Sequence, residues 1–223
     1  RALSSDPAEV GRIGAVIIET LQRNGIAACA KHFPGHGDAR ADSHTELPVI
    51  EQPPERLREQ DMAPFRAAVG ANVAGVMTAH ILYPSLDVEQ PATLSRTIVR
   101  DLLRDEIGHQ GLVVTDDLEM GAITQTHTVE QAAVAALGVG CDTALLCGAS
   151  VERHVSVLEA IIRAVEAKTL DVRTVEDALA RQRRVKGRFL AGARPRRPLA
   201  GKALRARLGT SAHQAVAEEI ARA

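Results

Sequence analysis

Apolar residues recur every three to four positions through the first twenty-five residues of the chain. The Asp-Pro pair at residues 6–7 supplies an N-cap and a first-turn proline, and a helical apolar face then runs over residues 10–21 until Gly25 ends it. The next apolar run, residues 26–31, is too short for a helix and is predicted to be a buried strand. The chain therefore begins with a helix followed by a strand.

This helix–strand unit repeats. Helical patterns cover residues 55–69, 96–107 and 129–137, short apolar strands follow them at residues 73–78, 112–115 and 143–146, and two amphipathic helices come last, at about 151–167 and 174–190. Strands that alternate with helices pair in parallel through right-handed crossovers, so the pattern predicts an α/β fold. Four such strands predict the C-terminal half of a TIM-type (β/α)8 barrel, with the N-terminal strands absent from this chain.

A Pro- and Arg-rich stretch at residues 192–202, containing ARPRRP, has no apolar period. We expect it to mark a domain edge, with residues 1–191 forming a partial catalytic barrel domain. Residues 192–223 are predicted to be a linker and C-terminal helix that lead toward an absent second domain. A nucleic-acid contact by the basic run is the less favoured interpretation. The chain opens at Arg1 without an initiator Met or a signal-peptide pattern, so we expect it to begin inside a longer protein.

Composition excludes several classes of partner. The chain is 45% hydrophobic and only 2% aromatic, which is typical of layered parallel β/α architectures with an aliphatic core. With 27 basic and 28 acidic residues, it has no global field to attract nucleic acid or an anionic membrane. The most apolar run, residues 132–151, is interrupted by glycines and Asp142, so we expect no membrane span. Three cysteines without metal-ligand spacing favour a reducing compartment, and hence the cytoplasm.

Polar residues gather where three of the four predicted strands end. The pair Lys31-His32 follows the first strand, His80 follows the second, and Asp116-Asp117 follows the third. In βα barrels the loops at this end present their side chains toward one mouth. The spacing therefore predicts a single pocket.

The densest polar cluster follows the first strand, where KHFPGHGD is followed by Asp42-Ser43-His44. Its glycines and proline predict a long loop, and long loops with reactive residues are commonly functional. Two other interpretations remain open. The cluster could be a solvated surface loop, or His32, His36, Asp38 and His44 could bind a metal, although no compact ligand motif is present.

The third strand, in VVTDDLEM, places a carboxylate next to aliphatic side chains. Asp116 is the better placed of the two aspartates to reach a substrate, whereas Asp117 points elsewhere by alternation and is expected to cap the following turn. Glycoside hydrolysis with retention needs such a nucleophile and a proton donor, typically two carboxylates about 5–5.5 Å apart. His44 can donate and accept the proton near neutral pH, and Asp42 can hydrogen-bond its ring and fix the tautomer.

These motifs resemble glycoside hydrolase family 3, specifically its β-N-acetylglucosaminidase branch. KHFPGHGDARADSH is similar to that branch's signature, and VVTDDLEM, MTAH, CDTALLCG and the initial RALSSDP are similar to further motifs of the family. By resemblance, Asp116 is the nucleophile, His44 the acid/base and Asp42 its partner. The resemblance also implies that Arg1, Lys31 and His32 bind sugar hydroxyls and that His80 lines the pocket, as part of the substrate-binding set.

The implied activity is removal of terminal β-linked GlcNAc, with peptidoglycan fragments as the expected source, through a glycosyl-enzyme intermediate. The expected partner is thus a small carbohydrate; no cofactor or metal is expected. The family's first four strands would precede Arg1, so we expect poor stability and little activity from this polypeptide alone. Two alternatives are a metal-dependent barrel hydrolase that uses His32, His36 and His44, and an inactive truncated fragment that binds sugar.

Overall fold

The computed structural model describes residues 3–37, 39, 41–148, 150–192 and 199–222. The chain divides into two compact units, residues 1–191 and 192–223. The second unit contains two short helices, α8 (Gly201–Arg205) and α9 (Ser211–Arg222), neither of which has a buried residue among those described. The interpretation of this unit as a linker toward another domain stays a prediction.

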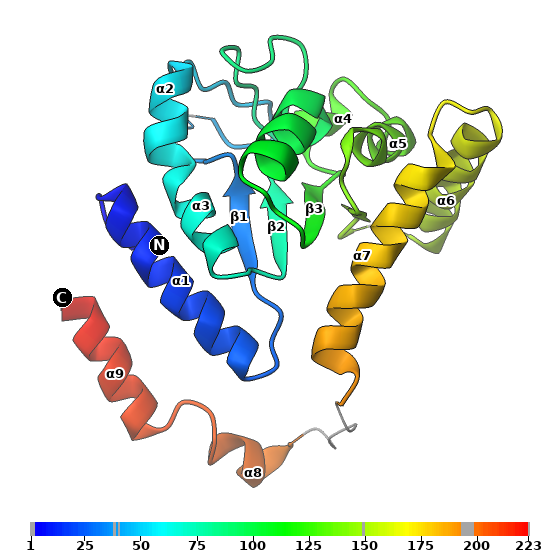
Figure 1. Ribbon diagram of the computed structural model, residues 1–223. Coiled ribbons are helices and arrows are strands. Elements are labelled where there is room, and N and C mark those ends of the chain that lie inside the picture. Colours follow the sequence, from blue (N-terminus) through cyan, green and yellow to red (C-terminus); the bar gives the residue numbers. More distant parts are fainter. Residues whose placement is uncertain (1–2, 38, 40, 149, 193–198, 223) are drawn as a thin grey trace. The chain divides into compact units, whose positions relative to one another are not determined.

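The first unit is built on four parallel strands, as the sequence predicts. The strands are β1 (Cys29–Phe33), β2 (Gly75–Thr78), β3 (Leu112–Asp117) and β4 (Thr143–Leu145). They lie in the order β1-β2-β3-β4, and each neighbouring pair is parallel. Figure 1 shows β1, β2 and β3 side by side, with helices packed around them. The predicted α/β fold with a parallel sheet is confirmed.

Helical segments connect the strands at the predicted places. In chain order they are α1 (Pro7–Arg23), α2 (Pro54–Arg56), η1 (Leu57–Asp61), α3 (Ala63–Gly70), η2 (Ala92–Leu94), η3 (Thr97–Glu106), α4 (Gly121–Thr124), α5 (Val129–Val139), α6 (Val151–Glu166) and α7 (Val172–Leu190). The Asp6 carboxylate caps α1 as predicted, accepting the N–H of Ala8. The single helix expected over residues 55–69 is interrupted at Met62, two residues before Pro64, which has no N–H to continue a helical ladder.

Two strands extend further than their apolar residues indicate. β1 continues to Phe33, whose carbonyl accepts the N–H of Ala79, and β3 continues to Asp117, whose register partner is Leu145. Backbone pairing thus carries polar residues into the strands, because a ladder hydrogen bond does not depend on the side chain. Residues that were expected just beyond the strands, such as His32 and Asp116, therefore lie in the last residues of β1 and β3.

The two faces of the sheet differ in burial. Val76, Thr78, Val113 and Thr115 are all fully buried, at 0% exposure, on the face covered by helices. On β1, Ala30 is the register partner of Val76, so the neighbouring Cys29 points to the opposite face of the sheet, and it is exposed. The core is aliphatic, and one of its few aromatic contacts is the edge-to-face pair of Phe33 and Phe65, 5.2 Å apart. Within the described ranges, no helix has the length and apolar character needed to cross a bilayer.

Candidate active site

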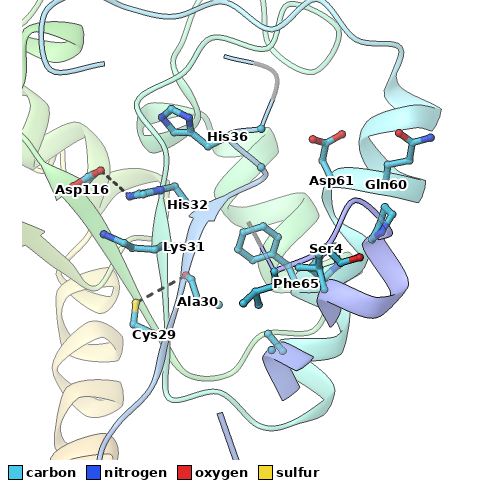
Figure 2. Close-up of a pocket in the computed structure, with 18 of the residues that line it drawn as sticks. Ser4, Cys29, Ala30, Lys31, His32, His36, Gln60, Asp61, Phe65 and Asp116 are labelled. Carbon is cyan, nitrogen blue, oxygen red and sulfur yellow. Dashed lines mark hydrogen bonds and ion pairs between the residues drawn. The ribbon is translucent and has the colours of Figure 1, made fainter. Parts of the chain in front are cut away.

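A cavity of about 940 Å³ lies along the edge of β1. Its polar wall is formed by Lys31, His32, His36, Asp42, His44 and Asp116. Its apolar wall comes from α1 and α3, and includes Ile17, Ile18 and Phe65. Figure 2 shows Asp116, His32 and Lys31 on one side of β1, with Phe65 and Asp61 on the other. The cavity thus unites side chains from segments more than seventy residues apart.

Side chains of β1 and β3 meet in this cavity where His32 approaches Asp116. The Nε2 nitrogen of His32 lies 3.4 Å from Oδ2 of Asp116, and both side chains are about one-fifth exposed. Burial lowers the pKa of His32 to about 4, although the neighbouring carboxylate opposes the shift. The His32 imidazole is therefore neutral at neutral pH and does not form an ion pair with the Asp116 carboxylate.

The other oxygen of Asp116 is held by its own strand end. Oδ1 accepts the backbone N–H of Asp117 at 2.9 Å, which leaves Oδ2 directed toward His32 and the cavity. A carboxylate with one oxygen anchored and the other aimed into a cavity has a fixed direction of attack. This geometry suits a nucleophile.

Asp117 performs the capping role predicted for it. Its Oδ1 accepts the N–H of Glu119 at 3.1 Å and that of Cys147 at 3.2 Å. The Glu119 carboxylate accepts the N–H of Gly148 at 2.9 Å. The carboxylates of Asp117 and Glu119 thus join the segments that follow β3 and β4. The sequence did not predict these contacts with Cys147 and Gly148.

The loop that carries His44 is a compact turn. The carbonyl of Asp42 accepts the N–H groups of Thr45 and Glu46, and its Oδ1 accepts the N–H of His44 at 3.0 Å. Among the described residues, no hydrogen bond joins the Asp42 carboxylate to the His44 ring, which differs from the expected dyad. The reason is local: an aspartate two residues before an amide readily forms this turn. Both side chains are exposed and line the cavity.

His80 lies outside the cavity lining. It is 1% exposed, with Nδ1 2.8 Å from the hydroxyl of Thr93 and Nε2 3.0 Å from the carbonyl oxygen of Asp117. Burial lowers the pKa of its ring, which stays neutral. The expectation that His80 lines the pocket is not met, because both ring nitrogens are occupied by the protein.

Of the remaining predicted binding residues, the structure describes Lys31 but not Arg1. Lys31 lines the cavity and is exposed, so its ammonium is available to a ligand. Arg1 lies outside the described residues, as does Asp38, one of the four residues of the metal hypothesis. The rings of His32 and His36 are 5.4 Å apart, but no group of three or more potential metal ligands comes together within the described part of the chain.

Tyr83 is a site-supporting residue that sequence reasoning missed. It is fully buried, and its hydroxyl donates to the carbonyl of Gly35. Gly35 has a φ of +152°, and a β-carbon there would lie 2.7 Å from that of Asp61. The loop after β1 therefore requires glycine at this position. Tyr83 carries no sequence signal, since it lies 48 residues from its partner.

The chain is similar in sequence and in structure to known proteins. Residues 1–185 match the glycosyl hydrolase family 3 N-terminal domain. A β-hexosaminidase from Idiomarina loihiensis is 38% identical over 169 residues, which cover 76% of this chain and 50% of that protein. A structure of a glycoside hydrolase family 3 β-N-acetylglucosaminidase from Paenibacillus superposes with a TM-score of 0.88 at 37% identity, covering 95% of this chain and 40% of that one.

A zinc-bound structure of CbsA from Thermotoga neapolitana is also similar, with a TM-score of 0.78 at 32% identity over 86% of this chain and 41% of that one. The chain spans half or less of the length of curated relatives such as the β-hexosaminidases of Aromatoleum aromaticum and Idiomarina loihiensis. The family match nevertheless covers most of this chain and contains every described residue of the cavity. The chain belongs to glycosyl hydrolase family 3.

Proposed function

We propose that the protein is a retaining β-N-acetylhexosaminidase that hydrolyses terminal β-linked GlcNAc. The observation that carries the proposal is the shared cavity, which brings the carboxylate of Asp116 and the imidazole of His44 to one space. The β-hexosaminidase and β-N-acetylglucosaminidase relatives support the choice of sugar. Peptidoglycan fragments are the source that the sequence resemblance favours, and the cytoplasm is the compartment.

The reaction takes place in two displacements. In the first, Oδ2 of Asp116 attacks the anomeric carbon and forms a C–O bond while the glycosidic C–O bond breaks. The leaving oxygen takes a proton from the imidazolium of His44. In the second, His44 accepts a proton from water, the water oxygen attacks the anomeric carbon, and the carboxylate of Asp116 is released. Two inversions return the original anomer.

Four further residues have supporting roles. His32, neutral and 3.4 Å from Asp116, is placed to hydrogen-bond a sugar hydroxyl beside the reacting carbon. Lys31 supplies a cationic donor from the same strand. Arg1 is assigned to the sugar by sequence resemblance alone. Asp42 orients His44 through the turn that its carboxylate caps. A hydrogen bond between this carboxylate and the His44 ring would require one of the two side chains to rotate.

The strands form one half of a (β/α)8 barrel in this proposal. The parallel order β1 to β4 and the burial of a single face support it, because the second face of such a sheet is normally covered by the opposite side of the barrel. The exposure of alternate residues on β1, Cys29 and Lys31, has the same explanation. The activity therefore belongs to the complete enzyme.

Product stereochemistry tests the proposal. The full-length protein is incubated with an aryl β-GlcNAc glycoside, and the first sugar released is followed by proton NMR before it mutarotates. The expected product is the β-anomer, with the matched aryl β-glucoside turned over more slowly. Release of the α-anomer first would indicate inversion and a different arrangement of catalytic groups, and no turnover of the GlcNAc glycoside would refute the proposal.

The metal-dependent hydrolase is the second candidate, favoured by the proximity of His32 and His36 and by the zinc-bound relative. Chelation distinguishes it. If Asp116 and His44 perform the reaction unaided, dialysis against EDTA leaves kcat unchanged and added zinc does not raise it. Loss of activity on chelation, restored by zinc, would favour the metal-dependent reaction.

A further inference from the structure

The loop that carries His44 is attached to the segment that follows the nucleophile strand. The carbonyl of Ser43 accepts the N–H of Ala122 at 3.2 Å, and the carbonyl of His44 accepts the N–H of Gly121 at 3.0 Å. The side-chain amide of Gln125 donates to the carbonyl of Thr45 at 2.8 Å. Three successive carbonyls of the loop are therefore bound by the first turn of α4 and the residue after it.

Gly121 permits this contact because it lacks a side chain. A β-carbon on Gly121 would lie 2.5 Å from the carbonyl oxygen of Thr45 and 2.9 Å from that of His44. Both atoms belong to backbone, so a methyl group could be accommodated only by moving the loop. The φ of Gly121 is not in the left-handed region, and the constraint is therefore one of space alone.

The contact fixes the loop to the element that holds Asp116. Only four residues separate Asp116 from Gly121 along the chain, and the Asp117 hydrogen bonds described above hold the intervening turn. Any displacement of His44 away from α4 thus changes its position relative to the nucleophile. General acid catalysis depends steeply on such positions, since misplacement of about 1 Å costs on the order of 100-fold.

The next part of the loop has its own attachment. The N–H of Leu82 donates to the carbonyl of Pro48, and the carbonyl of Leu82 accepts the N–H of Ile50, both at 2.9 Å. Breaking the contact with α4 would therefore release residues 43–45 without freeing the end of the loop. This separation allows the contact to be tested by substitution in a folded protein.

We propose that Gly121 and Gln125 are positioning residues that hold the His44 loop at the correct distance from Asp116. The inference rests on the proposed hexosaminidase function. Neither residue touches substrate in this account: each acts through the backbone of the loop. Their contribution should therefore appear only in the steps for which His44 supplies or removes a proton.

The test uses Gly121→Ala and Gln125→Ala in the full-length protein, with Gly138→Ala and Gln110→Ala as matched controls. Among the described residues, a β-carbon on Gly138 would come within 4 Å of a single side-chain atom, at 3.9 Å, and the exposed Gln110 donates to the carbonyl of nearby Gly108. The value of kcat/KM is measured for GlcNAc glycosides whose leaving groups range from dinitrophenolate, which needs no protonation, to an alkoxide, which does.

The expected result depends on the leaving group. For Gly121→Ala, kcat/KM should fall by at least about 10-fold with the alkoxide and by less than about 3-fold with dinitrophenolate, because only the former needs the acid. Azide should raise the kcat of the dinitrophenyl substrate and yield a β-glycosyl azide. Gln125→Ala should show the same pattern with a smaller loss, and the controls should match the wild type.

Equal losses for both leaving groups, or no loss in either variant, would overturn the positioning role while leaving the proposed function intact. If Gly121→Ala does not fold, Gln125→Ala decides the outcome by the same comparison. Failure of the wild-type protein to hydrolyse any GlcNAc glycoside would instead refute the proposed function, and this inference with it.

Discussion

The Nε2 nitrogen of His80 donates a hydrogen bond to the carbonyl oxygen of Asp117 across 3.0 Å. A carbonyl can only accept, so Nε2 carries the proton of the neutral ring and Nδ1 is an acceptor. The hydroxyl of Thr93 lies 2.8 Å from Nδ1 and 2.8 Å from the hydroxyl of Thr78, and it donates to the carbonyl of Ala79 at 2.9 Å. A buried chain of hydrogen bonds thus ends on the carbonyl of the residue that follows the nucleophile.

Replacing His80 should weaken catalysis more than binding. In His80→Ala the Asp117 carbonyl loses its donor, the strand end shifts, and kcat should fall by roughly 10- to 100-fold while KM changes by less than about 3-fold. His80→Gln, which can donate to the same carbonyl, should recover part of kcat. The exposed His154→Ala serves as the control. A rise in KM at constant kcat would indicate that His80 acts in substrate binding instead.

Asp142 should be essential for stability rather than for activity. It is 3% exposed, and its carboxylate binds Arg104 at 2.5 Å, Arg181 at 3.0 Å and the N–H of Val113 at 2.7 Å. Asp142→Asn leaves the buried guanidinium of Arg104 without its counter-charge, which typically costs roughly 3–5 kcal/mol.

Urea denaturation monitored by circular dichroism measures this loss. The exposed pair of Glu159 and Arg163 supplies the comparison, since Glu159→Gln should change the free energy of unfolding by less than about 1 kcal/mol. Equal effects of Asp142→Asn and Glu159→Gln would show that the buried network is not a major source of stability.

Stability should decrease as the pH is lowered from about 6.5 to about 4. His109 is 1% exposed, and burial lowers its pKa to about 4. In this window the unfolded chain binds a proton that the folded chain does not, so acid favours unfolding, by up to roughly 3 kcal/mol for this residue. His32, with its pKa also lowered to about 4, contributes in the same direction.

Denaturation midpoints measured between pH 4 and pH 8 report this dependence. His109→Gln should flatten the curve between pH 4 and pH 6.5, because the substituted amide does not titrate. The exposed His213→Gln serves as the control. A wild-type stability that is independent of pH across this range would contradict the assignment of neutral buried histidines.

The sequence predicts the sheet and the composition of the cavity because both follow from local patterns. Short aliphatic runs separated by helices specify parallel strands, and the carboxyl ends of parallel strands meet at one edge. This geometry alone places Lys31, His32 and Asp116 in one cavity. The turn-capping role of Asp117 follows equally from strand alternation.

Features that depend on distant residues could not be predicted in this way. The burial of His80 is set by Thr93 and by the Asp117 carbonyl, 37 residues away, and the steric role of Gly121 is set by a loop about 76 positions earlier. The hydrophobic periodicity of a sequence does not predict such long-range contacts. The hydrogen bond of Asp42 to the backbone of His44 is local, yet it competes with the expected ring contact, and both arrangements satisfy the same sequence.

In the proposed mechanism Asp116 forms a covalent bond to the sugar, and this adduct can be trapped. The full-length protein is treated with a 5-fluoro GlcNAc fluoride, which slows release of the glycosyl-enzyme, then digested and sequenced by tandem mass spectrometry. The predicted adduct lies on Asp116, and Asp116→Asn should be unlabelled and at least about 1000-fold slower in turnover, whereas the exposed Asp101→Asn should behave as wild type. An adduct on any other residue, or turnover by Asp116→Asn at the wild-type rate, would show that Asp116 is not the nucleophile.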